Sequence, residues 1–182
     1  MSQSLSQLRK FVSPEIIFGA GCRHNVGNCA KTFGARKVLV VSDPGVIAAG
    51  WVADVEASLQ AQGIDYFLYS DVSPNPRVEE VMLGAELYRE NHCDVIVAVG
   101  GGSPMDCGKG IGIVVAHGRS ILEFEGVDTI RVPSPPLILI PTTAGTSADV
   151  SQFVIISNQQ ERMKFSIVSK AVVPDVSLID PE

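Results

Sequence analysis

Short, continuous apolar runs alternate along the chain with longer segments in which apolar residues recur at helical spacing. The runs are rich in β-branched residues and end at glycine, proline or polar residues, which is typical of buried strands. Such strands are predicted at 37–41, 66–69, 95–99, 137–140 and 176–179. Helices are predicted at 23–32, 52–62, 76–92 and 104–118, and a short one begins at Pro44. This alternation predicts an α/β fold: a Rossmann-like, doubly wound, mainly parallel sheet with helices on both faces.

Two segments depart from this alternation. An edge strand is predicted within 11–21, where Pro14 interrupts the apolar pattern. Near the C-terminus, 153–157 and 164–168 predict the two strands of a small β-hairpin. No repeat or clear linker divides the 182 residues, so the sequence predicts one domain, 1–182.

The predicted strand 95–99 leads directly into three glycines, Gly100–Gly102. Glycine lets the backbone turn tightly and approach a ligand closely, because it carries no Cβ. Ser103 as the N-cap and Pro104 as the first helical residue predict that a helix begins where the glycines end. The unpaired N–H groups and positive dipole end of such a helix favour an anion, by roughly 0.3–1 kcal/mol. The pattern therefore predicts a phosphate or pyrophosphate site, although glycine-rich turns also occur where no ligand binds.

Other polar residues follow other predicted strands. Asp43, Asn75 and the hydroxyl-rich loop 142–146 each come after a strand, as the glycines do. Because the carboxyl ends of parallel strands meet at one edge of the sheet, we expect these residues to lie near the glycine turn. Asp43 and Asn75 also precede prolines, which predicts that they cap helices beginning at Pro44 and Pro76.

Composition narrows the class of protein. Apolar residues make up 46% of the chain, enough for a sizeable core, and the net charge of −6 argues against nucleic acid as a partner. No apolar segment approaches the ~20 residues of a membrane span, and the first ten residues lack a signal-peptide core. The four cysteines form no C-x-x-C pair, so we expect a reduced, cytoplasmic protein. The three histidines are far apart in sequence and predict no metal site.

Two motifs in combination indicate a family. The block VGGGSPMDCGKGIG and the block IPTTAGTSADVS, with VVSD early and SPNP between, resemble the N-terminal half of the iron-dependent (group III) alcohol dehydrogenases. The resemblance extends from about residue 16 to 181. Glycerol dehydrogenases and dehydroquinate synthases are more distantly similar.

The resemblance implies roles for the glycine turn and for the residue after the second predicted strand. The turn, as Gly100, Gly101, Gly102 and Ser103, would hold the pyrophosphate of NAD. Asp43 would accept hydrogen bonds from the adenosine ribose hydroxyls. A carboxylate there repels a 2′-phosphate, so the resemblance implies NAD rather than NADP.

The same resemblance implies further cofactor contacts. Asn75 would lie near the adenosine side, and Lys164 would approach the nicotinamide end. Thr142, Thr143 and Thr146 would line the adenine and phosphate side of the cleft. Local explanations also account for these residues, since the threonines can satisfy backbone groups in a turn and Lys164 can be a solvated charge.

Asp106 lies near the pyrophosphate in the family. Its local alternative is a place in the first helical turn, where it can pair with Lys109 three residues later, worth about 0.2–0.5 kcal/mol. Asp149 and Ser151 stand where the family usually has Glu and Thr, which affects the shape of the nicotinamide pocket.

The metal ligands of the family, one Asp and three His, lie in a helical C-terminal domain whose motif does not occur in this sequence. The resemblance therefore implies an NAD-binding fragment, inactive alone, of an enzyme that transfers hydride between a primary alcohol and its aldehyde, with Fe²⁺ or Zn²⁺ in the complete enzyme. A homodimer is also expected. The alternatives are the NAD-binding half of a dehydroquinate-synthase-like or glycerol-dehydrogenase-like enzyme, or a non-catalytic nucleotide-binding module.

Overall fold

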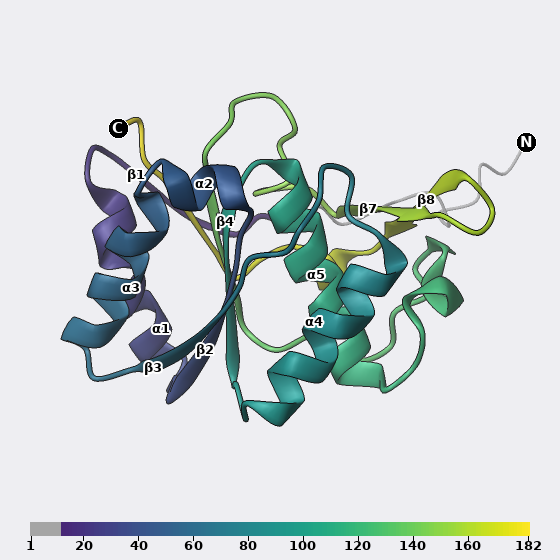
Figure 1. The fold of residues 1–182 in the computed structure, drawn as a ribbon, viewed down its shortest axis with the longest axis horizontal. Coiled ribbons are helices and arrows are strands. Elements are labelled where there is room, and N and C mark those ends of the chain that lie inside the picture. Colours follow the sequence, from purple (N-terminus) through teal and green to yellow (C-terminus); the bar gives the residue numbers. More distant parts are fainter. Residues whose placement is uncertain (1–11) are drawn as a thin grey trace, which may run out of the picture.

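A sheet of six parallel strands lies at the centre of the computed structural model, which describes residues 12–182 (Figure 1). The strands lie in the order β1-β9-β6-β4-β2-β3. They are β1 (Glu15–Phe18), β2 (Lys37–Val41), β3 (Asp65–Tyr69), β4 (Val95–Gly100), β6 (Leu137–Pro141) and β9 (Val176–Ile179). The order reverses between β2 and β4, because β3 pairs with one side of β2 while β4 and then β6 continue on the other. Doubly wound sheets bind their ligands at such a reversal.

Helices cover both faces of this sheet. Three of them, α1 (Val26–Thr32), α2 (Pro44–Ala48) and α3 (Trp51–Ala61), pack on one face. The longer α4 (Val78–Glu90) and α5 (Gly102–His117) pack on the other, as Figure 1 shows. Short 3₁₀ turns complete the connections, as η2 (Cys22–Asn25), η3 (Ile121–Phe124) and η4 (Lys170–Val172).

The core follows from the apolar runs, because successive side chains of a strand point to opposite faces of the sheet. Val38 and Val40 of β2 pack towards α1 and α3, whereas Leu39 and Val41 pack towards α4 and α5. All four are fully buried. Burial of one such side chain contributes about 1.5–3 kcal/mol, which explains why these strands are apolar on both faces.

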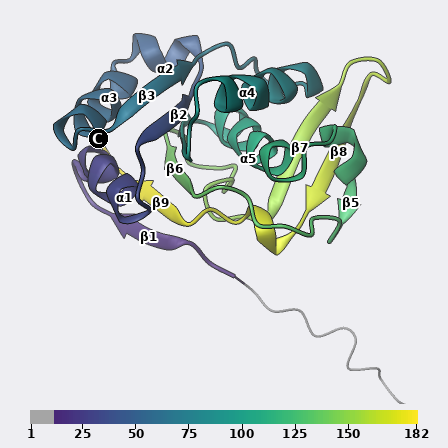
Figure 2. The same ribbon diagram turned by 90° about the horizontal axis from the view of Figure 1, so that it is seen from below.

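A second, smaller sheet lies outside the α4–α5 layer. It consists of β7 (Phe153–Asn158) and β8 (Met163–Val168), an antiparallel hairpin, and the two-residue β5 (Gly126–Val127). Figure 2 shows the hairpin beyond α5, on the side away from the six-stranded sheet. Val154 and Ile156 of β7 belong to the same core as α4 and α5, so the hairpin is anchored to these helices.

The structure confirms the predicted fold class, the parallel sheet and the hairpin. The predicted edge strand is shorter, at Glu15–Phe18, and Phe11 lies outside the described residues. Asp43 caps α2 as predicted: its Oδ1 accepts the N–H groups of Gly45 at 2.9 Å and Val46 at 3.0 Å.

The predicted cap at Asn75 is wrong. Asn75 has the left-handed φ of 60°, and α4 begins at Val78, with Arg77 as its N-cap. The N–H of Arg77 donates to the Glu80 carboxylate at 2.9 Å. The helix begins late because the carbonyl of Pro76 accepts the N–H of Ser157, at 2.8 Å, which holds this loop against β7.

The predicted start of α5 is also wrong. The helix begins at Gly102 rather than Pro104, with Gly101 as N-cap. Pro104 fits inside the first turn because an N–H there would lack an intrahelical acceptor in any case. Ser103 does not cap the helix, and its hydroxyl instead accepts the N–H of Asn75 at 3.1 Å.

Within residues 12–182, no helix combines the length and hydropathy that a bilayer crossing requires. All four cysteines are free thiols, and three of them are buried.

Candidate functional site

The polar residues predicted from the strand ends do meet at one edge of the sheet. Asp43 follows β2, the glycine turn follows β4, and Thr142 follows β6, so the three lie at the carboxyl ends of adjacent parallel strands. The reversal in strand order falls between β2 and β4. The fold therefore places Asp43 and the glycines on the two sides of the position where such sheets bind ligands.

The glycine turn brings bare backbone to the surface of this edge. Gly100 has a φ of 149°, and a Cβ on it would lie 2.6 Å from the Pro104 ring. A Cβ on Gly101 would lie 3.3 Å from Thr143 Oγ1, and one on Gly102 would lie 3.0 Å from Thr146 Cγ2. The two threonine side chains therefore pack closely against the main chain of Gly101 and Gly102, and a side chain on Gly100 would collide with the Pro104 ring.

The N-terminus of α5 presents unpaired donors at this turn. Within residues 12–182, the N–H groups of Gly102 and Ser103 have no hydrogen-bond acceptor, as expected for the first residues of a helix. A helix of 16 residues also places the positive end of its dipole here. Donors, dipole and absent side chains together suit an anion such as a phosphate.

One cavity opens on the β2 side of the turn, and we call it the Asp43 cavity. It has a volume of about 460 Å³. Its lining includes Asp43, Trp51, Gly101–Pro104, Thr142 and Thr143. Because both capping bonds of Asp43 go to Oδ1, the second carboxylate oxygen takes no part in the cap and is left for a ligand. This cavity combines an anion-binding backbone with a carboxylate acceptor.

A second cavity opens on the hairpin side of the turn, and we call it the Lys164 cavity. It has a volume of about 390 Å³. Its lining includes Asn75, Gly102, Ser103, Asp106, Thr146, Ser151, Phe153, Ile155 and Lys164. The Lys164 ammonium donates to Asn75 Oδ1 at 2.6 Å, and the N–H of Asn75 donates to Ser103 Oγ. Hydrogen bonds thus connect the hairpin to the start of α5 across this cavity.

Asp106 lies in the wall of the Lys164 cavity. Its Oδ2 accepts the N–H of Ile155 at 3.3 Å. Burial raises the pKa of this carboxyl to about 6, although the nearby Lys109 and the Ile155 hydrogen bond oppose the increase. The predicted direct pair with Lys109 is wrong, since no ion pair joins the two side chains in the described chain and Lys109 bonds elsewhere.

The raised pKa of Asp106 predicts a pH dependence of stability. The pKa of Asp106 is about 6 in the folded state and 3.8 in the unfolded state, so the folded state binds a proton at this carboxyl more tightly. The stability that comes from this protonation is fully present below pH ~4 and is lost as pH rises through 6. A shift of about two units corresponds to at most about 3 kcal/mol. We expect Asp106→Asn, which keeps an acceptor for Ile155, to gain free energy of unfolding relative to wild type between pH 4 and 7. Urea titrations of both proteins across this range measure it, and parallel curves would contradict it.

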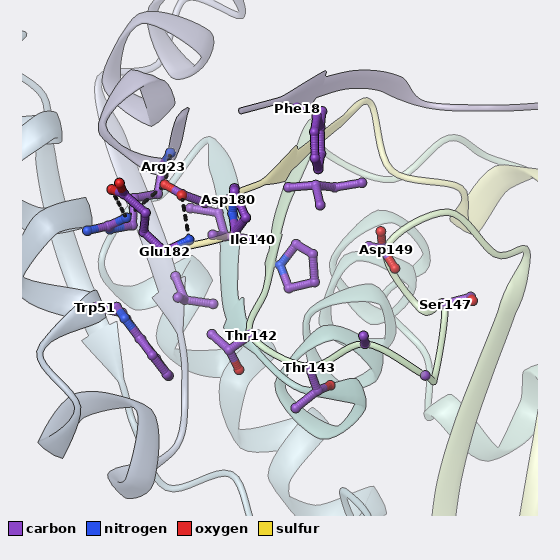
Figure 3. A pocket seen from close by; sticks show the side chains of 16 residues that line it. Phe18, Arg23, Trp51, Ile140, Thr142, Thr143, Ser147, Asp149, Asp180 and Glu182 are labelled. Carbon is purple, nitrogen blue, oxygen red and sulfur yellow. Dashed lines mark hydrogen bonds and ion pairs between the residues drawn. The ribbon is translucent and has the colours of Figure 1, made fainter. Parts of the chain in front are cut away.

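A third cavity lies on the other side of the threonine loop, and we call it the Trp51 cavity (Figure 3). It has a volume of about 560 Å³ and shares Trp51, Thr142 and Thr143 with the Asp43 cavity. Its other lining residues include Phe18, Arg23, Asp149 and residues 179–182. Nothing in the sequence pattern distinguishes Trp51, whose position fits an ordinary helix start.

An ion-pair network forms one wall of the Trp51 cavity (Figure 3). Arg23 pairs with Asp54 and with Asp180, at 2.8 Å each. Burial pushes the pKa of Asp180 upwards, but hydrogen bonds from Arg23, Glu182 and Gly21 outweigh it and hold the pKa at about 2. Asp180 stays ionised and fixes the end of β9 to the turn after β1.

Metal-ligating side chains do not gather in the described residues. Within 12–182, no group of three or more His, Cys, Asp or Glu has the spacing to hold a metal ion. The site therefore provides anion donors, a carboxylate and a lysine, but its residues do not fit a metal centre.

Known proteins resemble nearly the whole chain in sequence and in fold. The family model for iron-containing alcohol dehydrogenases matches residues 13–181. Alcohol dehydrogenase 4 of Schizosaccharomyces pombe is 40% identical over 166 residues, which are 91% of this chain and 39% of that protein. A crystal structure of 1,3-propanediol oxidoreductase superimposes with a TM-score of 0.93 at 36% identity, over 96% of this chain and 46% of that one.

A sulfoacetaldehyde reductase from Bifidobacterium kashiwanohense, solved in complex with NAD⁺, superimposes with a TM-score of 0.84 at 31% identity. The superposition covers 96% of this chain and 46% of the reductase chain. The chain thus spans less than half the length of each of these relatives. Since the family model covers nearly all of the sequence and the fold agrees, the chain belongs to the iron-containing alcohol dehydrogenase family.

Proposed function

We propose that this chain is the NAD-binding half of a metal-dependent alcohol dehydrogenase, and that residues 1–182 form its dinucleotide-binding domain. The complete enzyme would transfer hydride between a primary alcohol–aldehyde pair and NAD(H). The family favours this function over a dehydroquinate-synthase-like one.

One observation carries the proposal: the donor-rich glycine turn lies between two cavities of similar size. NAD has the same order of parts, with a pyrophosphate between two nucleoside halves. The free N–H groups of Gly102 and Ser103 and the dipole of α5 would bind the pyrophosphate. Each nucleoside half would then enter one cavity.

The chemistry of the walls indicates which half enters which cavity. Asp43 offers a carboxylate oxygen that suits ribose hydroxyls, so the adenosine half would occupy the Asp43 cavity, with Thr142 and Thr143 beside it. The nicotinamide half would occupy the Lys164 cavity. There Lys164 and Asn75 would contact its ribose and phosphate, and Phe153 and Ile155 would shield it from water. Asn75 is thus proposed for this cavity rather than the adenosine side, because it lines the Lys164 cavity alone.

Bound NAD⁺ supplies the acceptor for the hydride. The described residues contribute binding, orientation and exclusion of water, and they do not fit the metal that polarises the alcohol oxygen in this family. We propose that the ligands of Fe²⁺ or Zn²⁺ belong to the part of such enzymes that this chain does not span. A cytoplasmic location and a homodimer stay predictions.

Calorimetric titration of the chain with NADH tests the proposal. We expect saturable binding of one NADH per chain, and no oxidation of primary alcohols by the chain alone. ATP serves as the control for general affinity of the glycine turn for phosphates, and it should bind more weakly because it has no group for the Lys164 cavity. Absence of NADH binding, or equal affinity for both nucleotides, would contradict the proposal.

A further inference from the structure

Lys109 is a buried cation that the proposed function does not use. It lies on α5, the residue is 1% exposed, and it is among the largest residues with a fully buried side chain. Its Nζ has no carboxylate within 4 Å among residues 12–182. Burial lowers its pKa to about 8, although Asp106 and Asp149 oppose the decrease. An apolar side chain of similar size would avoid the several kcal/mol of desolvation that a buried ammonium costs.

The hydrogen bonds of Lys109 explain why an ammonium is needed. Nζ donates to the carbonyl of Ser151 at 2.8 Å, to the carbonyl of Phe153 at 3.1 Å and to Ser151 Oγ at 3.4 Å. A lysine has three donors, and here they meet three oxygens at the start of β7. No apolar side chain could hold these main-chain groups.

These two partners are themselves walls of the Lys164 cavity. Ser151 and Phe153 line it from the hairpin side, whereas Lys109 is not among its lining residues and lies behind them. One turn earlier on the same helix, Asp106 accepts the N–H of Ile155, the next wall residue along β7. Two charged side chains of α5 thus hold the main chain of three alternate residues, Ser151 just before β7 and Phe153 and Ile155 within it.

Because α5 also begins at the glycine turn, the arrangement links two sides of one cavity through a rigid helix. The N-terminus of α5 lines this cavity with Gly102 and Ser103, and the segment held by Lys109 lines it with Ser151 and Phe153. The position of that segment therefore affects the space beside the glycine turn. Without Lys109, the carbonyls of Ser151 and Phe153 would lose their partner, and this part of β7 would move.

We propose that Lys109 is a positioning residue for the cofactor: it fixes β7 at the distance from the glycine turn that the nicotinamide half of NAD requires. It touches no part of the cofactor and acts through Ser151 and Phe153. This inference rests on the proposed function, because it assumes that the nicotinamide half enters the Lys164 cavity. It predicts that loss of Lys109 impairs one half of the dinucleotide site and spares the other.

The test compares NADH with ADP, which has the adenosine half and the pyrophosphate but no nicotinamide. In the chain with Lys109→Met, we expect the Kd of NADH to rise at least tenfold and the Kd of ADP to stay within twofold, both by calorimetry. Amide hydrogen exchange in 153–158 should also become faster. Lys109→Gln places a neutral donor one bond shorter than lysine, so its affinity for NADH should lie between those of wild type and Lys109→Met. It replaces Lys109→Met in the test if the Met variant fails to fold.

Arg89→Met is the matched control. Arg89 donates to the carbonyl of Val114 at 2.6 Å, so this change also removes a bond from a cation to main chain on α5, but at the end far from the glycine turn. Its Kd for NADH should stay within twofold.

The outcomes separate this inference from the proposed function. If the wild-type chain binds NADH and the Lys109 variants bind it equally well, or lose NADH and ADP alike, the positioning role is overturned while the proposed function stands. A wild-type chain that binds NADH no more tightly than ADP overturns both, because the nicotinamide half then adds nothing to binding. A wild-type chain that binds neither nucleotide overturns both.

Discussion

Gly101→Val should abolish NADH binding while the fold persists. Gly101 lies in the wall of the Asp43 cavity, where even a Cβ would be 3.3–3.4 Å from Thr143. The two further methyl groups of Val would cover the N–H donors proposed for the pyrophosphate. Loss of about two hydrogen bonds to a charged group, each worth about 1.5–3 kcal/mol, weakens binding a hundredfold or more.

The backbone at residue 101 gives no reason for unfolding. Its φ of −77° and ψ of −163° are extended, a region that β-branched residues favour. We therefore expect a circular dichroism spectrum like that of wild type, and calorimetry with NADH should show no saturable heat.

Gly34→Ala is the control for a loss of stability alone. Gly34 has a φ of 74°, and a Cβ there meets nothing within 4 Å. The left-handed backbone costs alanine about 1–2 kcal/mol of stability, so this variant should unfold earlier yet bind NADH as wild type does. If Gly101→Val bound NADH as tightly as wild type does, the glycine turn would not be part of the binding site.

Features set by neighbours along the chain were predictable from the sequence. The apolar strands follow from their own composition, because both of their faces are buried by helices that the intervening segments form. The Asp43 cap involves partners only two and three residues away, so an Asp before a proline was a sufficient signal. The meeting of Asp43, the glycines and Thr142 at one edge then follows from parallel strands alone.

Features set by distant partners were not predictable. Asn75 fails to cap because residue 76 pairs with Ser157, and no local pattern records that pairing. Lys109 was expected to pair with Asp106, three residues away, but its partners lie 42 and 44 residues along the chain. The pair of Arg23 and Asp180 joins residues 157 positions apart. In each case tertiary packing brings together groups that are far apart in the sequence.

Replacement of Asp43 should change the preference of the site from NAD towards NADP. The proposed ribose contact puts this carboxylate next to the 2′ position, where NADP carries a phosphate. Two like charges about 4 Å apart repel by roughly 1–4 kcal/mol in a partly solvated site, a factor of about ten to a thousand in affinity. Asp43→Gly removes the charge, so the ratio of the Kd of NADPH to that of NADH should fall at least tenfold.

Asp43→Gly also removes the cap of α2, because Asp43 Oδ1 accepts the N–H groups of Gly45 and Val46. Asp43→Asn separates the two effects, since its amide oxygen can keep the cap without the charge. If charge decides between the cofactors, Asn and Gly should both lower the Kd ratio, and only Gly should also destabilise the fold. A ratio that changes in Gly but not in Asn would instead assign the preference to the position of α2, and an unchanged ratio in both would place the 2′ position away from Asp43. Titration of each variant with NADH and NADPH distinguishes these cases. The salt concentration must be the same in all titrations, because screening weakens the charge repulsion but not the cap.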